Sequence, residues 1–137
     1  MKPREPADFE WDKAQAHLAE AAAHDSIKTP MSLVHAAYYA AFHAALAVLL
    51  LKDKASPKKH GIVVQQFGLE VRDLPEPLLQ AGRDLRKLKE LRTKGDYDRE
   101  GFVSASDAEG AMRMAQHFVS IRAKQFGFPR GQSDRRD

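Results

Sequence analysis

A long and predominantly apolar stretch, VHAAYYAAFHAALAVLLL at residues 34–51, limits what this chain can fold into more than any other feature. Its length approaches the roughly 20 residues that a membrane-spanning helix needs. Two histidines, many alanines and polar residues on both flanks make the stretch poorly suited to face lipid. We therefore predict that it forms the central helix of a helical bundle, and we expect no membrane partner.

The composition favours one domain with one core. The chain has 137 residues, of which 43% are hydrophobic, and it contains no cysteine, which excludes disulfides, thiolate catalysis and cysteine-ligated zinc. The first residues, MKPREPADFEWD, lack the apolar run and the cleavage site of a signal peptide. We therefore expect a cytoplasmic protein. The formal charge of +3 is compatible with a polyanionic partner but does not establish one.

Apolar residues recur at steps of three and four, and no window alternates with the period of a β-strand. We therefore predict an all-α fold, an up-and-down bundle of about five helices over residues 8–126, with a flexible lead-in at 1–7 and a disordered tail at 127–137. Capping residues, prolines and a Ser-x-x-Glu capping box mark the ends. The predicted helices run from Asp8 to about Ala23, from Pro30 to about Leu51, from Ser56-Pro57 to the DLPEP segment, from Pro77 to about Lys94, and from the capping box Ser106/Glu109 to about Phe126.

The same periodicity predicts which side chains face the core. In order along the chain, these inward positions are Trp11, Ala14, Leu18 and Ala21 or Ala22; Ile62, Val63, Phe67 and Val71; Leu78, Ala81, Leu85, Leu88 and Leu91; and Ala111, Met114, Ala115, Phe118 and Ile121.

The histidines of the apolar stretch have a structural and a functional interpretation. His35, Tyr39 and Phe42 share a face of the helix, and buried polar groups must find partners whatever the function. Acid or base catalysis by His35 or His43 is the alternative, but no acid lies near His43 in sequence. No set of histidines has the spacing of a metal site. We therefore assign no metal and no cofactor.

Two clusters of cations are candidate anion-binding sites. Lys58, Lys59 and His60 come at the start of the third predicted helix, where they oppose the helix dipole, so they can either bind an anion or form a solvated helix end. The fourth helix carries an excess of cations that can lie along an RNA backbone or simply face solvent, and no aromatic residue among them supports base stacking. Its charged residues are Arg83, Arg86, Lys87, Lys89, Arg92 and Lys94 against Asp84 and Glu90.

The segment LRTKGDYDREG, residues 91–101, follows that cationic helix. Gly95 can adopt the left-handed turn that ends a helix, and nearby cations complement the dipole. In the functional interpretation, Arg92 binds a phosphate with its planar guanidinium, Asp96 orients or neutralises it, and Tyr97 supplies a hydroxyl. The residues alone leave both interpretations open.

Three segments in this order, SLVHAAYYAAFHAALAVLL, KKHGIVVQQF and LRTKGDYD, resemble the HEPN superfamily of small helical domains. The resemblance implies a four- or five-helix bundle, usually a homodimer, often encoded beside a minimal nucleotidyltransferase. Many members are metal-independent ribonuclease toxins with an arginine followed after four to six residues by a histidine. Arg92 matches the arginine, but Tyr97, Asp98 and Arg99 stand where the histidine would fall. The Arg-x-x-x-Asp-Tyr form is similar to a distinct subgroup.

The resemblance therefore implies a homodimeric binding module for RNA or a nucleotide, which can be one half of a toxin–antitoxin pair with a nucleotidyltransferase. The alternative is a ribonuclease weakened or altered by the missing histidine, with Arg92, Asp96 and Tyr97 as its catalytic residues, so the sequence does not decide whether the protein is an enzyme. A third interpretation gives these residues a structural role only. The candidate binding residues are Arg92, Lys94, Lys89, Lys58, Lys59 and His60.

Overall fold

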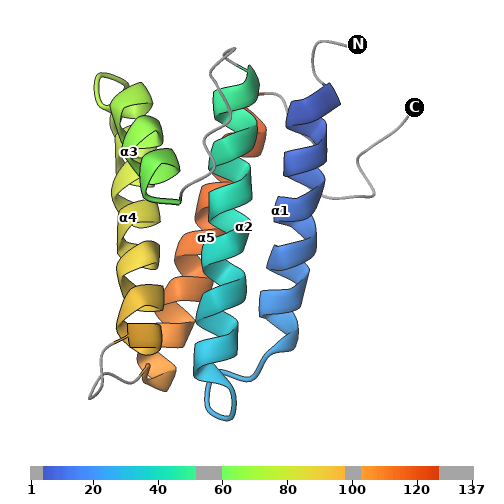
Figure 1. The fold of residues 1–137 in the computed structure, drawn as a ribbon, viewed down its shortest axis with the longest axis vertical. Helices are drawn as coiled ribbons and strands as arrows, with labels where there is room; N and C mark the ends of the chain where they lie inside the picture. The colour runs from blue at the N-terminus through green and yellow to red at the C-terminus, as the bar shows by residue number, and fades with distance from the viewer. Residues whose placement is uncertain (1–4, 52–59, 98–102, 127–137) are drawn as a thin grey trace.

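The protein is seen in a computed structural model that describes residues 5–51, 60–97 and 103–126. Five helices and no strand occur in these ranges, which confirms the predicted all-α fold. The helices run up and down along the long axis of the molecule, with α3 and α4 packed together at one side (Figure 1). Their bounds are α1 Glu5–Ala23, α2 Pro30–Leu51, α3 His60–Val71, α4 Glu76–Tyr97 and α5 Ala105–Phe126.

Helix α2 is the centre of the bundle and contacts each of the other four helices. It is the one described helix that is long and apolar enough to cross a membrane, yet 78% of its 18-residue apolar window is buried inside the fold. Its alanines allow neighbouring helices to approach closely, because a methyl group adds little bulk. The largest fully buried side chains around it are Trp11, Tyr38, Phe67 and Phe118.

The start of α2 is as predicted, because Pro30 is its first residue and the amide of Leu33 donates to the carbonyl of Thr29 at 3.1 Å. Helix α4 begins at Glu76, beside the predicted Pro77. Helix α1 begins at Glu5, so Asp8 lies inside the helix and does not cap it. The predicted start of the third helix at Ser56-Pro57 and the tail at 127–137 lie outside the described residues.

The capping box of α5 was predicted at Ser106 and Glu109, but the structure forms it two residues earlier, at Ser104 and Asp107. The amide of Asp107 donates to Ser104 Oγ at 3.0 Å, and the amide of Ser104 donates to Asp107 Oδ2 at 3.3 Å. Val103 and Ala108 are both buried on either side of this cap, as in a hydrophobic staple. Ser104 and Ser106 are each followed three residues later by an acid, so both could cap the helix. Burial of Val103 favours the cap at Ser104. Glu109 instead accepts a hydrogen bond from Ser26 Oγ at 3.1 Å.

Ile62, predicted to face the core, is 41% exposed, so that prediction is wrong. Of the two alternatives Ala21 and Ala22, Ala21 is the buried one. The helix end predicted at Gly95 is also wrong, because α4 continues through Gly95 to Tyr97. A glycine costs only about 1 kcal/mol in a helix, which packing of the preceding turns can outweigh.

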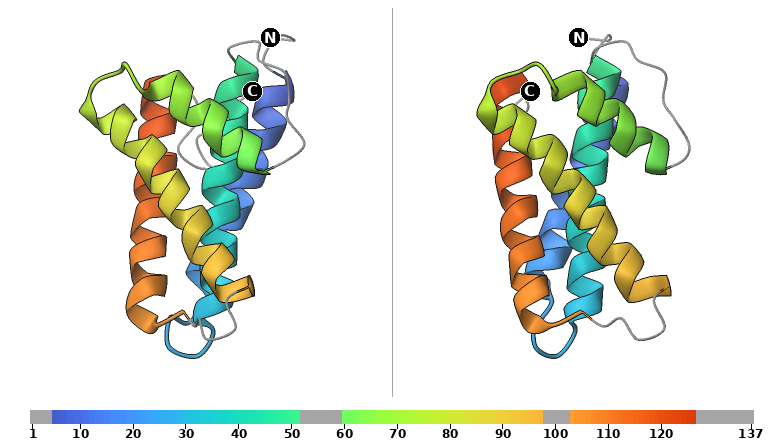
Figure 2. Two further views of the ribbon diagram at one scale, coloured as in Figure 1. Left: turned by 60° about the vertical axis from the view of Figure 1, so that its left-hand side comes forward. Right: turned by 90° about the vertical axis from the view of Figure 1, so that its left-hand side faces the viewer.

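Helices α3 and α4 cross closely at two glycines. A Cβ atom placed on Gly82 would lie 3.0 Å from Val71 Cγ2 and 3.6 Å from the Cα atom of Gly68. The two views of Figure 2 show the helices meeting near the turn that joins them and diverging from there. Small residues at the crossing thus set a V-shaped helix pair at one side of the bundle.

Candidate functional site

Arg92 lies on the inward side of α4, one and two turns beyond the buried Leu88 and Leu85. Its guanidinium carbon is 5.5 Å from the ring centroid of Tyr38 and 5.5 Å from that of Tyr39. Cations over tyrosine rings at this distance are attracted by the negative face of the ring. Two consecutive tyrosines of α2 therefore hold one guanidinium from α4. We call Arg92, Tyr38 and Tyr39 the arginine clamp.

The two tyrosines differ in their surroundings. Tyr38 is fully buried, whereas Tyr39 is only partly buried, and their rings are 5.3 Å apart at an angle of 62°. Burial raises the pKa of Tyr38 well above its usual value of 10, although the nearby positive charge of Arg92 opposes that rise. Tyr38 is therefore neutral at physiological pH and cannot serve there as a phenolate base.

The arginine clamp can bind an anion but cannot by itself transfer a proton. A guanidinium stays protonated in proteins and offers planar donors that match two oxygens of a phosphate. The side chain of Arg92 is neither fully buried nor fully exposed. Contact with two rings restricts its rotamers, so a bound anion would meet a cation whose position is already set.

Two other predicted site residues, Lys89 and Lys94, lie apart from the clamp. Lys89 and Lys94 line a groove of about 970 Å³ between α3 and α4, which Arg92 does not line. Lys58 and Lys59 lie outside the described residues, as do the side chains of His60, Asp96 and Tyr97, whose backbones are helical. The described residues thus place the predicted cations on two neighbouring faces of α4.

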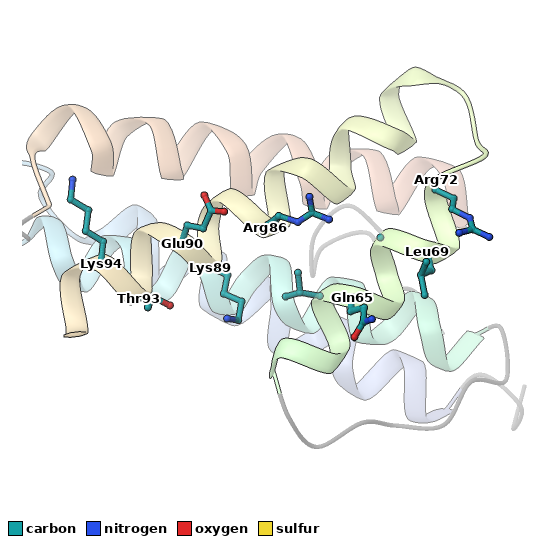
Figure 3. A pocket seen from close by; sticks show the side chains of 10 residues that line it. Gln65, Leu69, Arg72, Arg86, Lys89, Glu90, Thr93 and Lys94 are labelled. Carbon is teal, nitrogen blue, oxygen red and sulfur yellow. The ribbon is translucent and has the colours of Figure 1, made fainter. Parts of the chain in front are cut away.

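The α3–α4 groove is an elongated surface whose walls come from both helices (Figure 3). Gln65, Leu69 and Arg72 stand on the α3 side, and Arg86 and Lys89 stand on the α4 side. The described residues that line it are Val64, Gln65, Gly68, Leu69, Arg72, Arg86, Lys89, Glu90, Thr93 and Lys94.

A cluster between α1 and α2 was not predicted. His43 Nδ1 lies 2.6 Å from Glu10 Oε1, and the ring of His17 stacks on that of His43 with centroids 5.3 Å apart at 10°. An ionised carboxylate only accepts, so Nδ1 of His43 donates to it. Glu10 and His43 lie at equal sequence distances from the turn at Ser26 and Ile27. An antiparallel pairing of the two helices about this turn would therefore have predicted that the two side chains meet.

His43 is suited to remain neutral. Burial lowers its pKa, the hydrogen bond and charge of Glu10 raise it, and the neighbouring His17 and Lys13 lower it further. The ring of His43 also lies 6.4 Å from that of Tyr39, which belongs to the arginine clamp. Within the described part of the chain, no group of three or more His, Asp or Glu side chains is arranged to hold a metal ion.

Comparison with known proteins finds a matching family and a curated relative. The model of the HEPN domain family matches residues 8–125. A protein of Methanocaldococcus jannaschii named "Putative toxin MJ0605" is 39% identical over 85 residues, which are 61% of this chain and 60% of that protein. The chain thus spans about 60% of the length of the curated relative it matches. No solved structure matches.

Proposed function

We propose that this chain, which belongs to the HEPN family, is a toxin-like module that binds RNA as a homodimer and uses the arginine clamp as its central contact. The observation that carries the proposal is the guanidinium of Arg92, 5.5 Å from the centroids of both Tyr38 and Tyr39. RNA presents phosphates along its whole length, and a preset guanidinium fork is suited to bind them.

The dimer and its protein partner are further parts of this proposal. Family resemblance supports a twofold interface at which the Arg92 residues of two copies contact one RNA. The name of the matched relative, a putative toxin, supports a toxin-like role. The resemblance to the HEPN superfamily adds a nucleotidyltransferase as the second protein of a toxin–antitoxin pair. Sedimentation that gives a monomer at high micromolar concentration would contradict the shared site.

One observation favours a second candidate function, a metal-independent ribonuclease altered by the missing motif histidine. The rings of His35 and His43 each lie 6.4 Å from that of Tyr39, which also contacts Arg92. A neutral imidazole near this arginine can transfer protons at neutral pH. In this case the clamp binds the scissile phosphate, and cleavage proceeds by attack of the adjacent 2′-hydroxyl.

The two functions can be separated by incubating purified protein with labelled single-stranded RNA in the presence of EDTA and measuring both binding and cleavage. Binding without cleavage supports the module, and cleavage that Arg92→Ala abolishes supports the enzyme. Arg92→Ala should weaken RNA binding about tenfold, since charge-assisted hydrogen bonds are worth about 1.5–3 kcal/mol. Lys87→Ala is the matched control, because Lys87 is exposed on the same helix and contacts neither tyrosine ring.

Affinity must be expressed per folded molecule, with the folded fraction measured by circular dichroism in the same buffer. If Arg92→Ala and Lys87→Ala bind RNA equally once corrected in this way, the clamp has a structural role and the proposal is wrong. Arg92→Lys is a second test, because it keeps the charge but loses the planar guanidinium. Weaker RNA binding by this variant would show that the geometry of the guanidinium contributes as well as its charge.

A further inference from the structure

We propose that the α3–α4 groove is a docking surface for an acidic amphipathic helix of a partner protein. The proposal stands apart from RNA binding by the arginine clamp, because the groove is lined by a different face of α4 and by α3. In this proposal Lys89 and Lys94 bind a protein, whereas the sequence pattern predicted that they bind RNA or a nucleotide.

The shape of the groove follows from the close crossing at Gly68 and Gly82. Beyond that point α3 and α4 diverge, and their side chains form two walls of a trough (Figures 2 and 3). The lining residues run from Val64 to Arg72 on the α3 side and from Arg86 to Lys94 on α4, which corresponds to a length of about 12 Å. A groove of this length fits about two turns of a docked helix, enough for apolar anchors at positions i, i+3 or i+4, and i+7.

The charge of the groove selects an acidic partner. Of the lining residues that the structure describes, four are cations and one, Glu90, is an acid. Arg72 is partly neutralised, because its Nε lies 3.6 Å from Asp73 Oδ2. The other three cations come from α4, and Nη2 of Arg86 reaches across to within 3.9 Å of the Cβ position of Gly68. Carboxylates along both edges of a docked helix would meet these cations.

The apolar part of the groove selects a helix with an apolar stripe. Val64 is almost fully buried beneath it, while Leu69 is 53% exposed. Ile62 lies seven residues before Leu69, on the same side of α3 but outside the groove lining, and is 41% exposed. Two exposed aliphatic side chains beside cations form a surface that a partner can cover.

The same features argue against two other occupants. Among the described side chains that line the groove none is aromatic, so they offer the bases of single-stranded RNA no ring to stack on. A second copy of this chain docked groove to groove would bring two sets of cations together, which is unfavourable. An acidic helix satisfies the charge and the two exposed aliphatic side chains together.

A displayed library of random 16-residue peptides tests the proposal with full-length protein as bait. Selection is run in parallel on the wild type, on Arg86→Glu/Lys89→Glu, and on Arg83→Glu/Lys87→Glu. The last variant is the matched control, because it makes the same charge change on exposed residues of α4 that do not line the groove. Enriched peptides are then synthesised, and their affinity for each protein is measured by fluorescence anisotropy.

We expect the wild type to enrich peptides with leucine-like residues at helical spacing and Asp or Glu beside them. Their affinity should fall at least tenfold on the groove variant and less than twofold on the control. Leu69→Ser should also weaken them severalfold, whereas Ile27→Ser, at a similarly exposed isoleucine in the α1–α2 turn, should not.

Three results would overturn the proposal. The first is that no enriched peptide depends on Arg86 and Lys89. The second is that a single-stranded RNA, but no peptide, loses affinity in the groove variant, which makes the groove a nucleic-acid site. The third is that Leu69→Glu converts a dimer to a monomer in sedimentation, which makes a second copy the occupant.

Discussion

Glu10 and His43 are joined side chain to side chain across the α1–α2 pair, with 2.6 Å between Oε1 of the acid and Nδ1 of the imidazole. Both side chains are 17% exposed, so the contact is largely shielded from water. Lys13 lies 3.6 Å from the other carboxylate oxygen of Glu10, and the ring of His17 stacks on that of His43. The two helices are thus connected by a polar cluster at the edge of an otherwise alanine-rich contact.

The first prediction concerns pH. Burial lowers the pKa of folded His43 below its usual value of about 6.5, whereas the unfolded chain takes up this proton near that value. Below about pH 6.5 the unfolded state therefore binds more protons, and the free energy of unfolding falls as the pH drops toward the folded-state pKa. His43→Gln keeps a donor for Glu10 but does not titrate, so urea unfolding should show a smaller loss between about pH 7 and pH 5.5. His117→Gln, at an exposed histidine of α5, should retain the wild-type loss.

The second prediction concerns the arginine clamp as a structural element. Arg92→Ala removes a cation from two tyrosine rings, and we expect the free energy of unfolding to fall by about 1–2 kcal/mol in urea titrations. Lys87→Ala, on the exposed side of the same helix, should change it by less than about 0.5 kcal/mol. Equal effects of the two substitutions would show that the clamp adds nothing to stability.

The third prediction concerns the close packing of α2. Ala41 is fully buried in the core, so Ala41→Leu forces extra volume into it and should destabilise the fold by about 1–3 kcal/mol. Ala16→Leu makes the same change at an exposed position of α1 and should be nearly neutral. Thermal unfolding of both variants gives the comparison, and a tolerant Ala41→Leu would mean that the helices are less tightly packed than described.

The fourth prediction concerns the crossing of α3 and α4. Gly82→Ala gains about 1 kcal/mol of helix propensity, but its Cβ would lie 3.0 Å from a methyl of Val71, which is fully buried and has little room to move. We expect a net loss of up to about 2 kcal/mol from overpacking. Val71→Ala should relieve the clash, so a double-mutant cycle should give a favourable coupling between the two substitutions. Additive effects would contradict the close crossing.

The helices were largely predictable from local chemistry. Pro30 after Thr29 fixes the start of α2 because proline needs no amide partner there. The steps of three and four along α4 match the burial of Leu78, Ala81, Leu85 and Leu88. Failures fall where local signals compete. Gly95 permits a helix end without imposing one, and the choice between Ser104 and Ser106 depends on burial of Val103, a tertiary effect.

The site was predicted less well, because its contacts join distant parts of the chain. The motif identified Arg92 as a notable residue, but nothing local pairs it with Tyr38 and Tyr39 of α2. The charge pattern of α4 was visible, yet its division between the clamp and the α3–α4 groove depends on where α3 packs. Neither feature follows from spacing within one helix.

The central place of α2 has a consequence for how the protein is made. Its apolar surface is covered by α1, which precedes it, but also by α5, which follows the other four described helices along the chain. A nascent chain therefore carries the most apolar helix of the fold with one flank open to water until α5 has been synthesised. The bundle can close only when synthesis has passed residue 126, and until then this segment is the part of the chain most exposed to aggregation and to capture by chaperones.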